Sequence, residues 1–124
     1  MKYLLDSNII VDLTMNLDQR VVARAGECDA GDMVTSTVNL AEVALGSTRG
    51  DPPPLDQLRA FLEEVPVLDF DQAAAFAYTK LPFKRARFDR LIAAHALSLG
   101  LVVVTRNEQD FCDVPGLKVE NWTL

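Results

Sequence analysis

The sequence predicts a three-layer α/β/α fold built on a central parallel sheet of four or five strands. Short apolar runs with the length of buried strands alternate with longer segments whose apolar residues recur every three or four positions. Strands that alternate with helices pair in parallel through right-handed crossovers, which places helices on both faces of the sheet. With 49% hydrophobic residues, residues 1–124 fit a single domain with a substantial core.

The first half of the chain is expected to supply two strands and three helices. An apolar run starts at Tyr3 and stops at Asp6, which is typical of a buried central strand. Polar residues before the helical segments and glycines after them mark the helix ends. The expected elements are a strand at Tyr3–Leu5, a helix over Asn8–Leu13 capped by Ser7, a helix over Asp18–Cys28 closing at Gly31, a strand at Met33–Thr35, and a helix over Val38–Leu45 that Ser36 and Thr37 open and Gly46 ends.

The second half is expected to supply three strands and three helices. The prolines at 52–54 interrupt any regular element, and Pro82 makes residues 81–87 a linker. Apolar periodicity and the stop signal at Gly100 define the rest. The expected elements are helices over Leu55–Glu64, Asp71–Tyr78 and Asp89–Leu99, and strands at Val65–Leu68, Leu101–Val104 and Leu117–Val119.

The charge of the chain excludes one class of nucleic-acid protein. A net charge of -6 argues against a protein that coats nucleic acid through a broad basic face. It does not exclude an enzyme acting on nucleic acid, because a divalent metal can supply the positive charge at a phosphate. Basic residues gather in one segment that contains Lys84, Arg85 and Arg87, which is either an RNA-binding segment or a solvated helix end.

Targeting signals and cysteine usage indicate a cytoplasmic protein. The apolar stretch after Lys2 is interrupted by Asp6, Asn8 and Asp12, so it resembles neither a signal peptide nor a membrane span. Cys28 and Cys112 lack the spacing of a zinc site, which predicts free thiols in a reducing compartment.

Four acids stand where an open α/β sheet holds its ligands. Asp6 ends the first strand, Glu42 lies in the helix after the second, Asp89 starts a helix, and Asp110 follows the strand Leu101–Val104. Each has an ordinary explanation. Asp6 could be a turn or cap residue, Asp89 a first-turn acid and Asp110 a loop acid, while Glu42 could close a capping box that begins at Asn39.

Taken together, the four acids favour a metal site. Parallel strands bring their carboxyl ends to one edge of the sheet, where gathered acids repel each other unless a cation lies between them. Mg²⁺ and Mn²⁺ prefer oxygen ligands and bind substrate phosphates. Zinc is disfavoured because His95 is the single histidine, and its apolar neighbours predict a packed, hydrogen-bonded side chain instead.

At these acids the sequence resembles the PIN-domain ribonucleases, in particular the VapC-type toxins of type II toxin–antitoxin systems. Four stretches carry the resemblance in the same order, each with its acid, and the tail from Val114 to Trp122 is also similar. They are Tyr3-Leu4-Leu5-Asp6-Ser7-Asn8-Ile9, Ser36-Thr37-Val38-Asn39-Leu40-Ala41-Glu42, Phe88-Asp89-Arg90-Leu91-Ile92-Ala93-Ala94-His95-Ala96 and Val104-Thr105-Arg106-Asn107-Glu108-Gln109-Asp110-Phe111.

The resemblance implies a PIN-like fold and a metal-dependent endoribonuclease toxin. Asp6, Glu42, Asp89 and Asp110 would form its acidic Mg²⁺ or Mn²⁺ site. The supporting polar residues would be Asn107, Thr105, Ser7 and Asn8. The family also implies an RNA substrate, a homodimer and neutralisation by a cognate VapB-like antitoxin.

Two rival functions stay open. The first is a catalytically inactive PIN-like module that binds protein or RNA, against which the complete set of acids argues. The second is a Mg²⁺ phosphohydrolase of the haloacid dehalogenase kind, which needs an aspartate two residues after Asp6, where this chain has Asn8.

Overall fold

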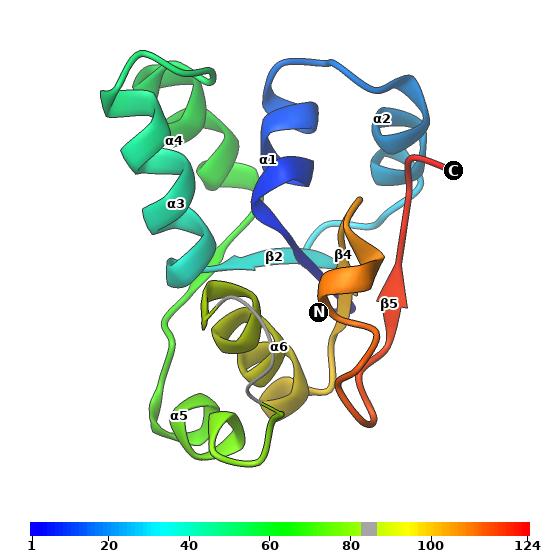
Figure 1. Cartoon of the computed structure of the whole chain (residues 1–124). Coiled ribbons are helices and arrows are strands. Elements are labelled where there is room, and N and C mark those ends of the chain that lie inside the picture. The colour runs from blue at the N-terminus through cyan, green and yellow to red at the C-terminus, as the bar shows by residue number, and fades with distance from the viewer. Residues whose placement is uncertain (83–86) are drawn as a thin grey trace.

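The computed structural model of the chain describes residues 1–82 and 87–124, with the side chain of Arg87 also outside the description. In this part of the chain, helices and strands alternate largely as the sequence predicts (Figure 1). The strands are β1 (Tyr3–Leu5), β2 (Met33–Ser36), β3 (Val67–Leu68), β4 (Val102–Val104) and β5 (Val119–Glu120). The helices are α1 (Ser7–Thr14), α2 (Gln19–Gly26), α3 (Thr37–Thr48), α4 (Leu55–Glu64), α5 (Gln72–Tyr78) and α6 (Arg87–Leu99), with a 3-10 turn, η1 (Glu108–Asp110).

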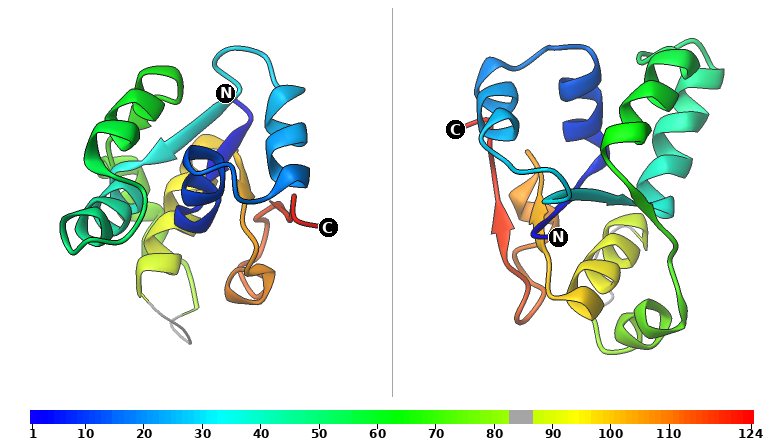
Figure 2. Two further views of the ribbon diagram at one scale, coloured as in Figure 1. Left: turned by 90° about the horizontal axis from the view of Figure 1, so that it is seen from above. Right: turned by 180° about the vertical axis from the view of Figure 1, so that it is seen from behind.

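The sheet is parallel and has the order β3-β2-β1-β4-β5, so β1 lies at its centre. Helices α1 to α4 cover one face and α5 and α6 the other, in Figure 1 and in the view from behind in Figure 2. Neighbouring residues of β1 point to opposite faces, because Leu4 packs with α6 and Leu5 packs with α1 and α3. The predicted three-layer α/β/α class with up to five parallel strands is confirmed.

Helix α3 is longer than the sequence predicts. Gly46 does not end it, since the helix continues to Thr48 and the chain turns at Gly50, whose φ of 95° is in the left-handed region that favours glycine. A glycine inside a helix costs only about 1 kcal/mol, which packing can offset. The prediction that Gly46 ends the helix is therefore wrong, and the glycine at which the chain turns is Gly50, four residues later.

Several other boundaries differ from the prediction. Asp6 rather than Ser7 is the N-cap of α1, and strand β3 begins at Val67 instead of Val65. Helix α2 ends at Gly26 rather than Cys28, and Asp18 is its N-cap, accepting hydrogen bonds from the N–H groups of Arg20 and Val21. Strand β5 begins at Val119 instead of Leu117, because pairing with β4 starts at the partners Val103 and Val119.

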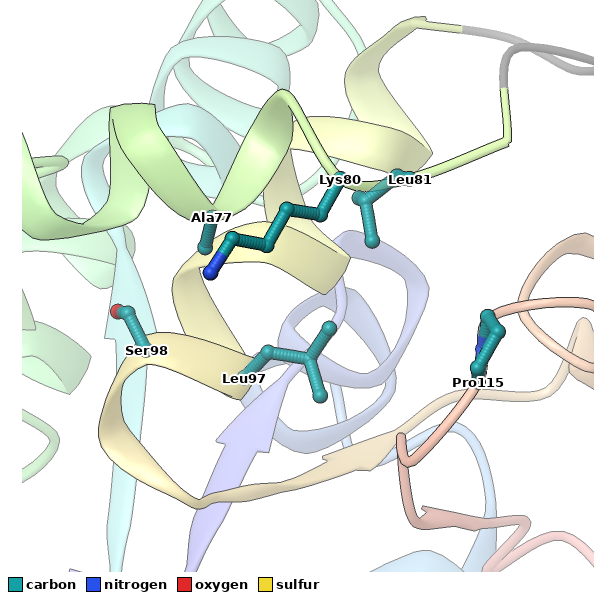
Figure 3. Close-up of a pocket in the computed structure, with 6 residues that line it drawn as sticks. All are labelled: Ala77, Lys80, Leu81, Leu97, Ser98 and Pro115. Carbon is teal, nitrogen blue, oxygen red and sulfur yellow. The ribbon is translucent and has the colours of Figure 1, made fainter.

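An apolar hollow lies on the surface away from the sheet edge where the acids are expected. It has a volume of about 430 Å³ and lies beside the end of α6, with Lys80 across its mouth (Figure 3). Leu97 and Ser98 line it from the last turns of α6, whereas Asp89 lies in the first turn of that helix. Among the described helices, none has the length and apolar character needed to span a membrane.

Candidate functional site

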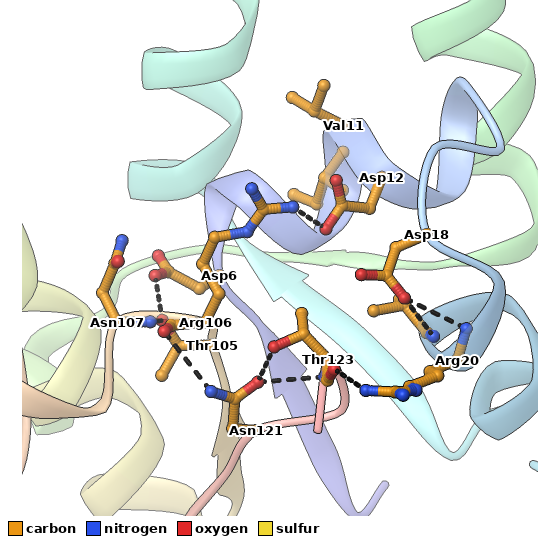
Figure 4. Close-up of polar contacts among 12 residues, drawn as sticks. Asp6, Val11, Asp12, Asp18, Arg20, Thr105, Arg106, Asn107, Asn121 and Thr123 are labelled. Atoms are coloured by element: carbon orange, nitrogen blue, oxygen red, sulfur yellow. Dashed lines mark hydrogen bonds and ion pairs between the residues drawn. The ribbon is translucent and has the colours of Figure 1, made fainter.

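Asp6 occupies the carboxyl end of the central strand and is only 6% exposed. Its backbone N–H donates to the carbonyl of Val104 at 2.9 Å, so the β1–β4 pairing fixes its place. Three donors hold its side chain. The N–H of Ser7 and the amide of Asn39 donate to Oδ1 at 2.9 and 3.2 Å, and the hydroxyl of Thr105 donates to Oδ2 at 2.8 Å (Figure 4).

Glu42 reaches the same place from α3 and is half-buried. Its Oε1 accepts a hydrogen bond from the Ser7 hydroxyl at 3.0 Å. The capping-box explanation of Glu42 is wrong, because the helix is capped by Ser36, whose hydroxyl accepts from the N–H of Val38, and Asn39 lies one turn inside. Glu42 is therefore free of a capping duty and faces Asp6.

Asp89 and Asp110 complete the group from the other side of β1. Asp89 is half-buried in the first turn of α6, and Asp110 is half-buried at the end of η1. Burial, then the charges of Asp6, Asp110 and Glu42, raise the pKa of Asp89 to about 6, and Arg90 opposes the shift. The charges of three separate segments act on this one carboxylate, so the fold places Asp6, Glu42 and Asp110 within electrostatic reach of Asp89.

The pKa values of Asp6 and Glu42 are raised as well. Burial is the largest cause that raises the pKa of Asp6, and the charge of Asp110 adds to it, while the hydrogen bonds from Thr105, Ser7 and Asn39 oppose it. Burial also raises the pKa of Glu42, with a further contribution from Asp6. For both Asp6 and Glu42, burial and a neighbouring acid thus disfavour the charged form, and hydrogen bonds within the described residues oppose the shift.

This donor set fits a hard divalent cation that keeps part of its water shell. Within residues 1–82 and 87–124, no three carboxylate, imidazole or thiol groups stand close enough to enclose a metal ion by themselves. Mg²⁺ is commonly held by one or two carboxylates plus waters and substrate phosphates, so a ready-made cage is not required. The oxygen-only chemistry and the repulsion among the acids both match such an ion.

The predicted supporting residues divide into those in contact with the acids and those that are not. Ser7 and Thr105 bond directly to Glu42 and Asp6. Asn107 lies exposed at the start of η1 without a capping bond from its side chain, and Asn8 is exposed on α1. Lys84 and Arg85 lie outside the described residues, as does the side chain of Arg87, so the predicted RNA contact of this segment stays a prediction.

His95 is a core residue, as the sequence predicts. It is 1% exposed, its Nδ1 lies 2.8 Å from the hydroxyl of Ser36, and its ring meets Phe70 edge to face at a centroid distance of 5.5 Å. Burial lowers its pKa, so the ring is neutral at pH 7. The thiols of Cys28 and Cys112 are free, which agrees with the sequence prediction.

An ion pair beside the site was missed by the sequence analysis. Asp12 of α1 is 2% exposed and pairs with Arg106, which follows Thr105 directly (Figure 4). The pair ties α1 to the loop that carries Thr105 and Asp110. A signal was present, since Asp12 lies three residues after the buried Ile9 and so shares its helix face.

Comparison with known proteins identifies the family. A model of the PIN domain matches residues 3–117. The chain belongs to the PIN domain family. This PIN domain is 34% identical to the tRNA(fMet)-specific endonuclease VapC of Shigella flexneri over 99% of both chains, and 30% identical to the protein of the same name from Salmonella typhimurium over 98% of both. It is thus a VapC-type PIN domain, and the resemblance noted in the sequence is confirmed.

Solved structures support the same assignment. One is the structure of VapBC2 from Rickettsia felis bound to a DNA fragment from its promoter. A chain of that structure superposes on this PIN domain with a TM-score of 0.85 at 26% identity, over 98% of this PIN domain and 99% of that chain. A chain of VapBC-1 from nontypeable Haemophilus influenzae gives a TM-score of 0.81 at 30% identity, with full coverage of both chains.

Proposed function

We propose that this PIN domain is a metal-dependent endoribonuclease toxin that hydrolyses RNA phosphodiester bonds. The observation that carries the proposal is the grouping of Asp6, Glu42, Asp89 and Asp110: burial, and then the charges of the other three acids, raise the pKa of Asp89 to about 6. The names of the relatives support the reaction class, since those from Shigella flexneri and Salmonella typhimurium are endonucleases and one from Haemophilus influenzae is a ribonuclease.

Asp6, Asp89 and Asp110 would hold one or two Mg²⁺ or Mn²⁺ ions. When bound there, the metal supplies positive charge to the scissile phosphate and makes water a better nucleophile. Asp6 is the most rigid of these ligands, because three hydrogen bonds fix its two oxygens. Its buried position also keeps solvent from competing for the inner face of the site.

Glu42 would take up or hold a proton beside the attacking water, or bind the metal through water. Its raised pKa makes it a better base than an exposed glutamate, and the Ser7 hydroxyl fixes one of its oxygens. Attack by water in line with the 3′ oxygen breaks the bond between that oxygen and phosphorus, and the 3′ oxygen takes up a proton, which gives a 5′-phosphate and a 3′-hydroxyl.

The biological setting follows from the relatives. Structures of VapBC from Rickettsia felis and Haemophilus influenzae match this PIN domain over its whole length. We therefore expect a VapB-like antitoxin as partner, a homodimeric toxin and a cytoplasmic location. The free thiols of Cys28 and Cys112 suit a reducing compartment.

The test is RNA cleavage by the full chain with Mg²⁺ or Mn²⁺, followed by analysis of the product ends. Wild type should cleave, Asp6→Asn should not, and the products should carry 5′-phosphates. Products with 2′,3′-cyclic phosphates would contradict hydrolysis by water. Equal inertness of wild type and Asp6→Asn across structured RNAs would favour the alternative, a catalytically inactive PIN-like binding module.

A further inference from the structure

Asn39 lies between two of the acids and is completely buried. Its side-chain amide donates to Oδ1 of Asp6 and to Oγ of Ser7, both at 3.2 Å. Helix α3 does not need this side chain for its cap, which Ser36 provides. Both hydrogens of the amide therefore serve residues of the β1–α1 junction, more than 30 positions away in the sequence.

The amide of Asn39 sets the direction of a chain of hydrogen bonds. Because Ser7 Oγ accepts from Asn39, its single hydroxyl hydrogen is available to donate to Oε1 of Glu42, at 3.0 Å. The opposite amide orientation would place an oxygen against the Asp6 carboxylate. One side chain thus orients Asp6 directly and Glu42 through Ser7.

The carbonyl oxygen of Asn39 shows that this arrangement has a cost. It is buried and has no hydrogen-bond partner within the described structure. A buried acceptor without a partner costs about 1–3 kcal/mol, and an apolar side chain of the same shape would avoid that cost. The two donated hydrogen bonds, one of them to a carboxylate, offset this cost.

We propose that Asn39 is a positioning residue for the metal site, orienting Asp6 directly and Glu42 through the Ser7 hydroxyl. The inference rests on the proposed function, in which these carboxylates bind a divalent cation. Removing a partner that orients a metal ligand weakens metal affinity by about 10-fold or more. Asn39 itself touches neither metal nor RNA in this account.

The experiment is a titration of the full chain with Mn²⁺ in the absence of RNA. The electron paramagnetic resonance signal of the free Mn²⁺ reports how much of the ion is bound. Asn39→Leu keeps the approximate shape and removes both donors, and Asn39→Ser keeps one hydroxyl donor. The matched control is Thr35→Val, because Thr35 is equally buried beside β1 but its hydroxyl donates to the carbonyl of Leu5 at 3.1 Å rather than to an acid.

We expect the Mn²⁺ dissociation constant to rise about 10-fold in Asn39→Leu, less in Asn39→Ser, and not at all in Thr35→Val. A wild-type constant in Asn39→Leu would overturn the inference and leave the proposed function intact. If Asn39→Leu does not fold, an unchanged constant in Asn39→Ser overturns it in the same way. A wild-type chain that binds no Mn²⁺ would overturn both.

Discussion

Asp6 and Asp12 are two buried aspartates six residues apart, and their surroundings are opposite. Asp12 is 2% exposed and has its countercharge in Arg106. Asp6 is 6% exposed, accepts hydrogen bonds from three neutral donors within residues 1–82 and 87–124, and its pKa is raised in part by the charge of Asp110. Buried charges are normally paired, so Asp12 has the surroundings of a residue that stabilises the fold, whereas Asp6 has those of the metal ligand that we propose it to be.

The largest expected effect separates the two aspartates by activity. Asp6→Asn should lower the rate of RNA cleavage by about 100-fold or more, because a metal ligand that stabilises charge at the phosphate is lost. Its thermal midpoint in EDTA should not fall, since one member of a repelling group becomes neutral. Cleavage kinetics and thermal unfolding of the same preparation measure both, and a residual rate near wild type would remove Asp6 from the site.

Asp12 should show the converse behaviour. Asp12→Asn should lower the free energy of unfolding by about 1–2 kcal/mol, less than for a fully buried pair because Arg106 remains partly in water. A double-mutant cycle with Arg106→Gln, in which urea unfolding in EDTA measures the stability of each variant, gives the coupling energy of the pair. A coupling energy near zero would mean that Asp12 is not stabilised by its partner.

The charge on Asp89 should appear in the pH dependence of stability. Its pKa is about 6 in the folded chain and near its ordinary value of 3.8 in the unfolded chain, so between these values the folded state binds more protons. Stability in EDTA should therefore fall as the pH rises from about 4 to about 6, by about 1 kcal/mol after allowing for the partial exposure of the carboxylate.

Asp89→Asn is the matched variant for this effect. In this variant, stability should no longer show the part of its fall between about pH 4 and about pH 6 that Asp89 causes. At about pH 7.5 in EDTA, urea unfolding should show that the variant is more stable than wild type. Added Mg²⁺ should stabilise wild type and have a smaller effect on Asp89→Asn. A variant that is less stable than wild type in EDTA would show that the charge of Asp89 has a partner within the protein.

The sheet and the position of the four acids can be predicted from the sequence. The alternation of strands and helices predicts the sheet, and parallel topology then places Asp6, Glu42, Asp89 and Asp110 at one edge. Helix α4 is predicted to both of its ends, because prolines precede it and its apolar spacing is regular.

What the sequence does not predict depends on pairing between distant segments. The partner of Asp12 is 94 positions away, and nothing in the local pattern distinguishes Arg106 from other arginines of the chain. Asn39 lies on the same helix face as Glu42, yet its contact with Asp6 requires the packing of α3 against the β1–α1 junction. Local signals identify the charges, and tertiary packing decides which of them are compensated.

The most direct test of this account is an NMR titration of the Asp89 side-chain carboxyl carbon, first in EDTA and then with Mg²⁺. We predict a pKa of about 6 in EDTA, where burial and the charges of Asp6, Asp110 and Glu42 raise it, and a value below the ordinary 3.8 with Mg²⁺ bound. An ordinary pKa in EDTA, or a raised pKa that Mg²⁺ leaves unchanged, would contradict a metal site at these four acids.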